Sequence, residues 1–160
     1  MIGVDYVRQM AAYNQWMNDK LYAAAASLPP VLIEKIADAP PIPLPPAAAR
    51  PLSGLRVLDL TRVIAGPVAG RTLAAHGADV LHISAAHLPS FDELVMDTGR
   101  GKRTASLDLR APADRTRLRD LAVSADIFLQ GYRPGAIAGH GFAPEALAAL
   151  NPGIICVSLS

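Results

Sequence analysis

The chain has 160 residues, of which 51% are hydrophobic and 18% are charged, and its 15 basic and 14 acidic side chains leave a net charge of +1. This composition excludes a disordered chain, because half of the residues are able to bury apolar surface. It also disfavours a nucleic-acid-binding protein, because no surplus of positive charge is present to neutralise phosphates. The sequence opens with no signal-peptide pattern, and prolines interrupt every apolar run before it reaches the ~20 residues of a membrane helix. We therefore expect a cytoplasmic protein with neither nucleic acid nor a membrane as a partner.

Residues 1–30 predict a single amphipathic helix. Apolar residues recur at three- and four-residue spacing from Met10 to Leu28, and Pro29 ends the pattern. A lone helix cannot bury its own apolar face, so this one is expected to dock on the rest of the chain, on another copy or on elements outside the chain. Residues 31–50 follow as a Pro- and Ala-rich linker, because crowded prolines hold a chain extended and semi-rigid.

From residue 51 short apolar runs alternate with Ala-rich helical windows, a pattern typical of βαβ units. Strands are predicted at 55–60, 79–83, 104–109, 126–130 and 154–159. Helices are predicted at 68–76, from Pro112 onward, near 134–138 and at 144–150, with Gly77 ending the first. The stretch between the second and third strands is predicted to be a long loop. The fold class is therefore α/β, a Rossmann-like parallel sheet with flanking helices. It is expected to be incomplete, because the apolar last strand reads as a central one.

Ligands of open parallel sheets bind outside the carboxyl ends of the strands. The first strand-to-helix turn carries Gly66 and Gly70 but lacks the Gly-x-Gly-x-x-Gly pattern of nicotinamide-binding enzymes. A strand rather than a helix follows the tetrad at 101–104, which argues against a nucleotide triphosphatase.

The basic cluster at 100, 102 and 103 fits either a solvated surface or contacts with a phosphorylated cofactor. The four histidines lack ligand spacing, so no metal is expected, and Cys156 is expected to be a small buried residue.

Five motifs follow one another from residue 51 to the last residue. They are PLSGLRVLDLTRVIAGP at 51–67, GADV at 77–80, GKR at 101–103 before LDL at 107–109, AD at 125–126 before YRPG at 132–135, and NP at 151–152 before the fifth strand. In this order they resemble the family III CoA-transferases, the CaiB/BaiF group. The resemblance covers residues 51–160. It implies a Rossmann-like domain that binds coenzyme A, in subunits that form homodimers in the full-length family.

The resemblance also implies a reaction and a set of binding residues. The family moves CoA between an acyl-CoA and a carboxylic acid through an aspartyl anhydride, and related members racemise α-methylacyl-CoA. Residue matching implies that CoA approaches two backbone turns and one basic pair, namely Val63 and Ile64, Gly131 and Tyr132, and Lys102 and Arg103.

The family's catalytic aspartate matches no residue of this chain, because it lies on a segment that follows the fifth strand. Four aspartates instead match structural positions of the family: Asp59, Asp79, Asp108 and Asp126. We therefore expect the CoA-binding portion of a transferase, which on its own has no turnover. The alternative is a non-catalytic remnant or interaction module from a truncated or fused reading frame.

Residues 6–28 carry a second, shorter resemblance. The segment YNQWMNDKL at 13–21 is similar to the opening helix of the DinB-like four-helix bundles. Those proteins bind a metal through histidines on later helices, whereas the matching segment here contains no histidine. The alternative is an ordinary amphipathic leader.

Overall fold

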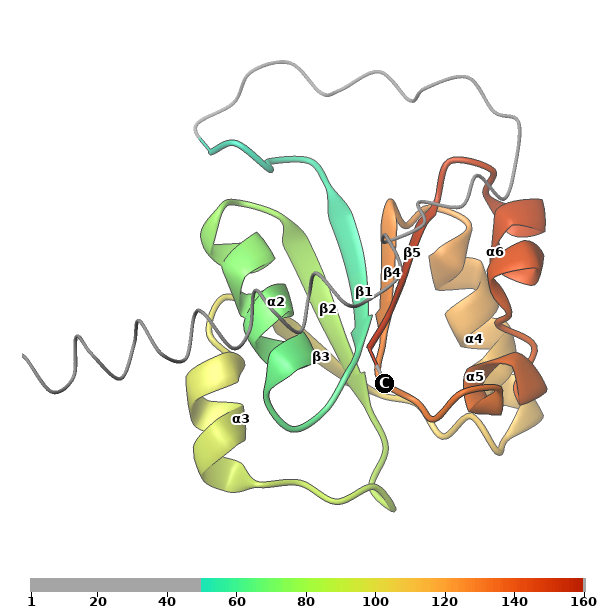
Figure 1. Ribbon diagram of the computed structural model, residues 1–160, viewed down its shortest axis with the longest axis horizontal. Coiled ribbons are helices and arrows are strands. Elements are labelled where there is room, and N and C mark those ends of the chain that lie inside the picture. Colours follow the sequence, from blue (N-terminus) through green and yellow to red (C-terminus); the bar gives the residue numbers. More distant parts are fainter. Residues whose placement is uncertain (1–49, 160) are drawn as a thin grey trace, which may run out of the picture. The chain divides into compact units, whose positions relative to one another are not determined.

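A computed structural model describes residues 50–159 of the chain. The predicted N-terminal helix, its DinB-like resemblance and all but the last residue of the predicted linker lie outside the described residues. The described part is a parallel sheet with helices on both faces, α2 and α3 on one and α4, α5 and α6 on the other (Figure 1). Its elements in chain order are β1 Arg56–Leu60, α2 Ala65–Ala75, β2 Asp79–Ser84, α3 Asp92–Thr98, β3 Arg103–Ser106, α4 Pro112–Ala122, β4 Ile127–Gln130, α5 Ala136–Gly139, α6 Pro144–Leu150 and β5 Ile155–Ser158.

The five strands lie in the order β3-β2-β1-β4-β5, and every neighbouring pair is parallel. The predicted α/β class and the parallel sheet are therefore confirmed. From β1 the chain adds β2 and then β3 on one side of β1. It then crosses back and adds β4 and β5 on the other side of β1. The strand order thus reverses between β1 and β4, and at such a point the connecting segments diverge and leave room for a ligand.

Both faces of the central strand β1 are buried, as its apolar sequence predicts. Val57 packs with Val80 and with Ala74 of α2 on one face. Leu58 and Leu60 face the other helical layer, where Phe128 and Phe142 stack with their ring centroids 6.1 Å apart. The sheet is therefore held between two apolar layers, which fixes the carboxyl ends of the strands as a rigid rim.

Three local predictions need correction. A helix, α3, occupies part of the segment predicted to be a long loop. The third strand ends at Ser106 rather than residue 109, because the chain then turns so that the Asp108 amide donates to Asp114 at the start of α4. Helix α2 begins at Ala65, so Pro67 is its third residue, a position where a missing N–H costs no helical hydrogen bond. Gly77 follows the end of α2 with φ 106, as predicted.

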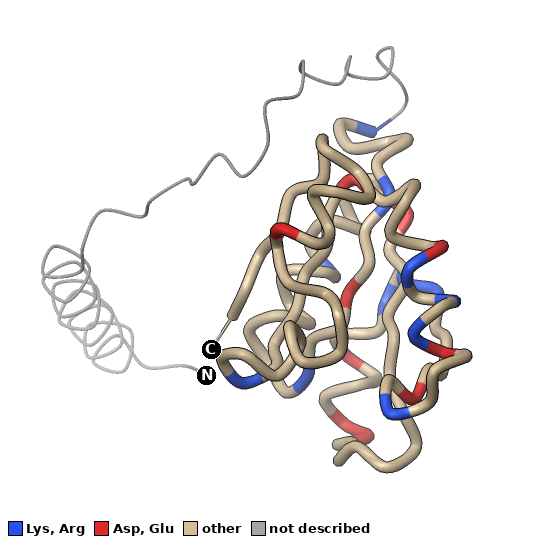
Figure 2. Tube along the Cα trace, turned by 90° about the vertical axis from the view of Figure 1, so that its right-hand side faces the viewer, with Lys and Arg blue, Asp and Glu red and all other residues tan. Residues whose placement is uncertain are grey.

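Charged residues of both signs are interspersed along the described trace (Figure 2). None of the helices within residues 50–159 is long and apolar enough to cross a membrane.

Cys156 in β5 is half-buried rather than fully buried, and burial raises the pKa of its thiol.

Candidate functional site

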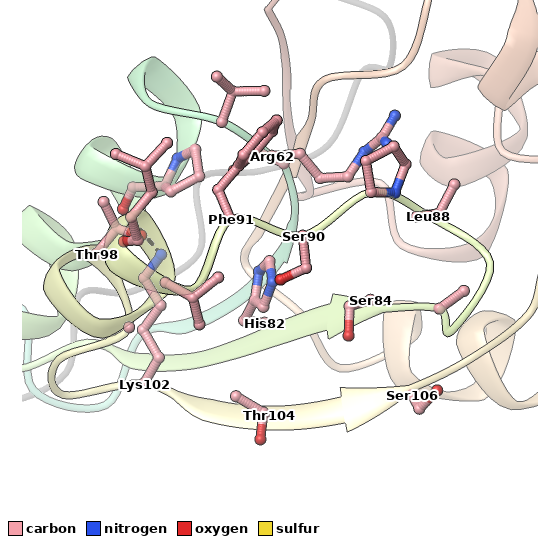
Figure 3. A pocket seen from close by; sticks show the side chains of 18 of the residues that line it. Arg62, His82, Ser84, Leu88, Ser90, Phe91, Thr98, Lys102, Thr104 and Ser106 are labelled. Carbon is pink, nitrogen blue, oxygen red and sulfur yellow. Dashed lines mark hydrogen bonds between the residues drawn. The ribbon is translucent and has the colours of Figure 1, made fainter.

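A pocket of about 290 Å³ lies at the carboxyl ends of β1, β2 and β3, on the face that α2 and α3 cover. The floor consists of polar side chains from two neighbouring strands (Figure 3). His82 lies beside Thr104 and Ser84 beside Ser106 in the strand register. Apolar side chains of the α3 region, namely Phe91, Leu94 and Val95, line the opposite wall. The pocket thus combines a hydrogen-bonding floor with an apolar wall, as small-molecule sites commonly do.

A buried ion pair closes the inner end of this pocket. The ammonium group of Lys102 lies 2.7 Å from Oδ2 of Asp59, and the two side chains are only 2% and 0% exposed. Burial alone raises the pKa of Asp59, but the neighbouring His82, Lys102 and Thr61 side chains outweigh it and hold that pKa below its usual value. The carboxylate is therefore ionised in the folded protein at neutral pH.

Each member of the ion pair also binds the segment that joins β1 to α2. Oδ1 of Asp59 accepts a hydrogen bond from the backbone N–H of Thr61 at 3.0 Å and another from its hydroxyl. Nζ of Lys102 donates to the carbonyl oxygen of Pro67 at 2.8 Å. Both ends of the turn from 61 to 67 are thus attached to one buried pair.

The middle of this turn has an unusual backbone. Val63 has a φ of 72°, the positive-φ non-glycine residue of the described chain. A β-branched side chain is strained in this region, at a cost on the order of 1–3 kcal/mol, and such strain persists only where the surroundings impose it. Val63 and Ile64 are each 55% exposed, so their side chains point toward solvent at the pocket mouth.

Two glycines let α2 pack directly on the turn and the ion pair. A Cβ at Gly66 would overlap the side chain of Thr61. A Cβ at Gly70 would lie 2.9 Å from Nζ of Lys102 and still closer to Asp59. The spacing of four places both glycines on the same face of the helix, which explains why this strand-to-helix turn carries glycines without a dinucleotide-binding pattern.

His82 is the remaining polar group against the ion pair. Its Nδ1 is buried, lies 3.7 Å from Oδ2 of Asp59 and has no hydrogen-bond partner in the described structure. The ring contributes to the pocket floor. Its Nδ1 therefore faces the Asp59 carboxylate rather than the open part of the pocket.

The structure brings four of the six predicted binding residues to one edge of the sheet. Val63 lines the pocket, and Ile64, the next residue, is exposed but does not line it. Gly131 follows β4 and packs against Thr61, since a Cβ there would lie 3.6 Å from the Thr61 Cα. Tyr132 comes next and packs on the core beneath α5, and burial raises the pKa of its phenol. These residues flank the point where the strand order reverses.

The predicted basic pair is split. Lys102 lines the pocket, but its ammonium is turned inward to Asp59. The Arg103 side chain lies on the opposite face of the sheet, toward the amino ends of the strands, where Nε donates to Asp79 at 2.9 Å. Arg103 therefore does not line this pocket.

Several pocket residues were not among the sequence-based candidates. Arg62 lies within the motif at 51–67 but was not singled out there, and Phe91 lies on a loop without a recognisable pattern. The polar residues of the floor do have a pattern in the sequence, because His82 and Ser84 are spaced by two, as are Thr104 and Ser106. Side chains at this spacing share one face of a strand. Within residues 50–159, no three His, Cys, Asp or Glu side chains are close enough together to share a metal ion.

Residues 52–160 match the sequence profile of CoA-transferase family III. The chain belongs to this family. It is 44% identical over 98 residues to an acyl-CoA transferase of Gibberella moniliformis, covering 61% of this chain and 17% of that protein. It is 35% identical over 128 residues to succinate–glutarate CoA-transferase of Agrobacterium fabrum, covering 69% and 32%.

Solved structures of family proteins share the fold of this chain. The crystal structure of a Mycobacterium tuberculosis protein, curated as a probable fatty acyl-CoA transferase, is 34% identical with a TM-score of 0.66, covering 70% of this chain and 32% of that one. A CaiB/BaiF family protein from Brucella suis is 31% identical with a TM-score of 0.63, covering 68% and 33%. The chain spans about a third or less of the length of these relatives.

Proposed function

We propose that the chain provides the coenzyme A-binding portion of a CoA-transferase that moves CoA between an acyl-CoA and a carboxylic acid. The observation that carries this proposal is the place of the pocket. The chain belongs to this family, and its pocket opens at the carboxyl edge of the sheet beside the exposed turn of Val63 and Ile64. The name of the Agrobacterium relative, a succinate–glutarate CoA-transferase, supports a carboxylic acid as the acceptor.

The proposal assigns CoA contacts to Val63, Ile64, Gly131 and Tyr132. These residues lie on the two loops that leave β1 and β4, the central neighbours at which the strand order reverses. Gly131 leaves backbone groups accessible, and the valine and isoleucine offer an apolar surface to the adenine or pantetheine part. Arg103 is given no contact with CoA, because its pairing with Asp79 holds its side chain on the face of the sheet away from the pocket.

We further propose that the nucleophile of the reaction is not one of the four aspartates at the strand ends. Each has a structural partner. Asp59 pairs with Lys102 and Asp79 with Arg103. Asp108 accepts from Nη2 of Arg110 at 2.6 Å, and Asp126 accepts from the backbone N–H of Arg56 at 2.7 Å. A carboxylate held in this way is a poor attacking group, so this portion binds CoA and another part of the enzyme supplies the nucleophile.

A second candidate function is an interaction module, and the surface of β5 favours it. Among the described strands, β5 pairs with β4 alone, and Ile155 and Val157 are exposed on it. An apolar edge strand of this kind readily pairs with another chain. A module of this class binds a protein and does not bind CoA.

Calorimetric titration of the folded chain with CoA distinguishes the two functions. Micromolar affinity supports the CoA-binding portion, and Ile64→Asp is expected to weaken it by at least tenfold because a carboxylate replaces the apolar surface offered to the adenine or pantetheine part. Val123→Asp is the matched control, since Val123 is 54% exposed at the end of α4 and lines no part of the pocket. A folded chain that gives no heat at millimolar CoA would contradict the proposal and favour the interaction module.

A further inference from the structure

The ion pair of Asp59 and Lys102 is unusual in being both buried and connected to one turn. The two residues are 43 positions apart in the sequence and meet at 2.7 Å beneath α2. Removing two charges from water is costly, and apolar residues of similar size commonly serve stability as well or better. A contribution to stability alone therefore does not account for a charged pair at this place.

The pair does what apolar side chains cannot do, because its polar atoms reach the backbone. Asp59 accepts the N–H of Thr61 at the start of the turn, and Lys102 donates to the carbonyl of Pro67 at its end. Between these two anchors lies Val63 with its positive φ. The strain of that residue requires a surrounding structure that fixes both ends of the turn, and the ion pair provides both attachments.

The exclusion of solvent strengthens these attachments. Gly70 brings the backbone of α2 directly against the pair, so that no side chain separates them. Hydrogen bonds to charged groups in a site of low dielectric constant are stronger than those between neutral groups in water. Lys102 thus uses its charge inside the protein and has little of it left for a ligand phosphate.

We propose that Asp59 and Lys102 are positioning residues for CoA binding, which hold the turn of Val63 and Ile64 in its strained, exposed conformation through Thr61 and Pro67 without touching CoA. This inference rests on the proposed function for its consequence in CoA affinity. Its structural part, the control of the turn, is independent of CoA. Lys102 then acts from beneath the site, whereas the sequence resemblance implies a direct contact.

The test replaces the pair by two apolar residues in the 160-residue chain, Asp59→Leu with Lys102→Met. The single variant Lys102→Met is expected to lose stability, because it leaves a buried charge unpaired, and the double variant is expected to recover it. CoA affinity, measured by calorimetry, is expected to stay at least tenfold weaker in the double variant. Recovery of CoA affinity together with stability would overturn the proposal, since a merely structural role predicts it.

Hydrogen–deuterium exchange of the segment 61–68 gives a readout that needs no ligand, and its reporter is the Val68 amide, which donates to the carbonyl oxygen of Ile64 at 2.8 Å. In the double variant this amide is expected to exchange at least tenfold faster, while those of β4 keep their protection. Unchanged exchange in the segment would overturn the positioning role even if CoA affinity fell. A wild-type chain that does not bind CoA defeats the proposed function alone, and the exchange data still decide the positioning role.

A milder variant covers the case in which the double variant does not fold. Thr61→Val has nearly the same shape and removes only the hydroxyl that donates to Asp59. It is expected to shift exchange and CoA affinity in the same direction by a smaller factor. Arg117→Met is the matched control for Lys102→Met, because Arg117 pairs with Asp114 on the exposed side of α4, away from the turn.

Discussion

The buried carboxylate of Asp59 makes the stability of the fold depend on pH in a defined direction. Its pKa in the folded protein is below the ordinary 3.8, so its ionised form stabilises the fold above that pH. This contribution is lost as the pH falls below 3.8 and through the folded pKa. Lys102 is the charged partner of this carboxylate. Without Lys102, burial would raise the pKa of Asp59 with fewer contacts to lower it.

Lys102→Met is therefore expected to destabilise the fold by about 3–5 kcal/mol at pH 7, because the buried Asp59 loses its partner. In the variant the pKa of Asp59 rises, so protonation at lower pH relieves the unpaired charge and the difference from the wild type shrinks toward pH 4.5. Urea unfolding at both pH values measures this difference. An equal loss at the two pH values would contradict the assignment, and Arg117→Met is expected to change stability by about 0.5 kcal/mol or less at either.

Glycine substitution provides a second prediction about single residues. Gly70→Ala is expected to destabilise the fold by about 1–3 kcal/mol, because its Cβ would press on Lys102 and Asp59. Gly139→Ala in α5 is the matched control. A Cβ there meets nothing within 4 Å, so the helix is expected to gain about 0.5–1 kcal/mol. Thermal unfolding of the two variants compares them directly, and a neutral Gly70→Ala would show that α2 does not pack tightly here.

The burial of Lys102 lay beyond sequence reasoning. Its neighbours Arg100 and Arg103 make it look like one member of a basic surface cluster. Only the tertiary arrangement brings it to Asp59, and no pattern along the chain marks a pair 43 residues apart. The turn at Val63 and Ile64 was predictable, by contrast, because the sheet-edge rule depends on topology alone.

Among the helices and strands, the buried ones were easier to predict from the sequence than the exposed ones. The central strands β1 and β4 were found because parallel strands buried on both faces read as apolar runs. Helix α3, DELVMDT, was missed because its only buried residue is Thr98, while Val95 and Met96 are exposed. A seven-residue helix without an apolar stripe toward the core has no periodic signal.

The helix starts offer a prediction at this scale. Helix α4 begins with Pro112 at its first position, after Ala111, which has the extended backbone of an N-cap but no side chain able to accept a helix N–H. Ala111→Ser is expected to stabilise the fold by about 1 kcal/mol, because its hydroxyl oxygen can accept an unpaired amide of the first turn. Ala113→Ser, one residue inside the helix, is the control and is expected to give no gain. Urea midpoints measure both, and equal effects would contradict the capping argument.

Over the whole described molecule, sheet topology and composition explain where a ligand can bind. The order β3-β2-β1-β4-β5 places the loops after β1 and β4 side by side. The sequence predicted a parallel sheet and the edge at which ligands bind, but not this strand order. The pocket itself was less predictable, because part of its wall comes from α3 and from the loop that precedes it. The proposed function at this scale combines a binding edge in this chain with a nucleophile supplied by another part of the enzyme.

The last prediction is that the 160-residue chain alone does not catalyse CoA transfer. The aspartates at its strand ends are paired with Lys102, Arg103, Arg110 and a backbone amide, so none is placed to attack a thioester. Bound CoA would then be positioned without an acyl acceptor, and positioning does not replace a nucleophile. The assay follows exchange of CoA between a labelled carboxylic acid and an acyl-CoA, with circular dichroism confirming that the chain is folded. Sustained turnover that is abolished by Asp→Asn at one of these four positions would show that a paired aspartate is the nucleophile after all. Turnover that survives all four substitutions would instead place the nucleophile at another residue of the chain.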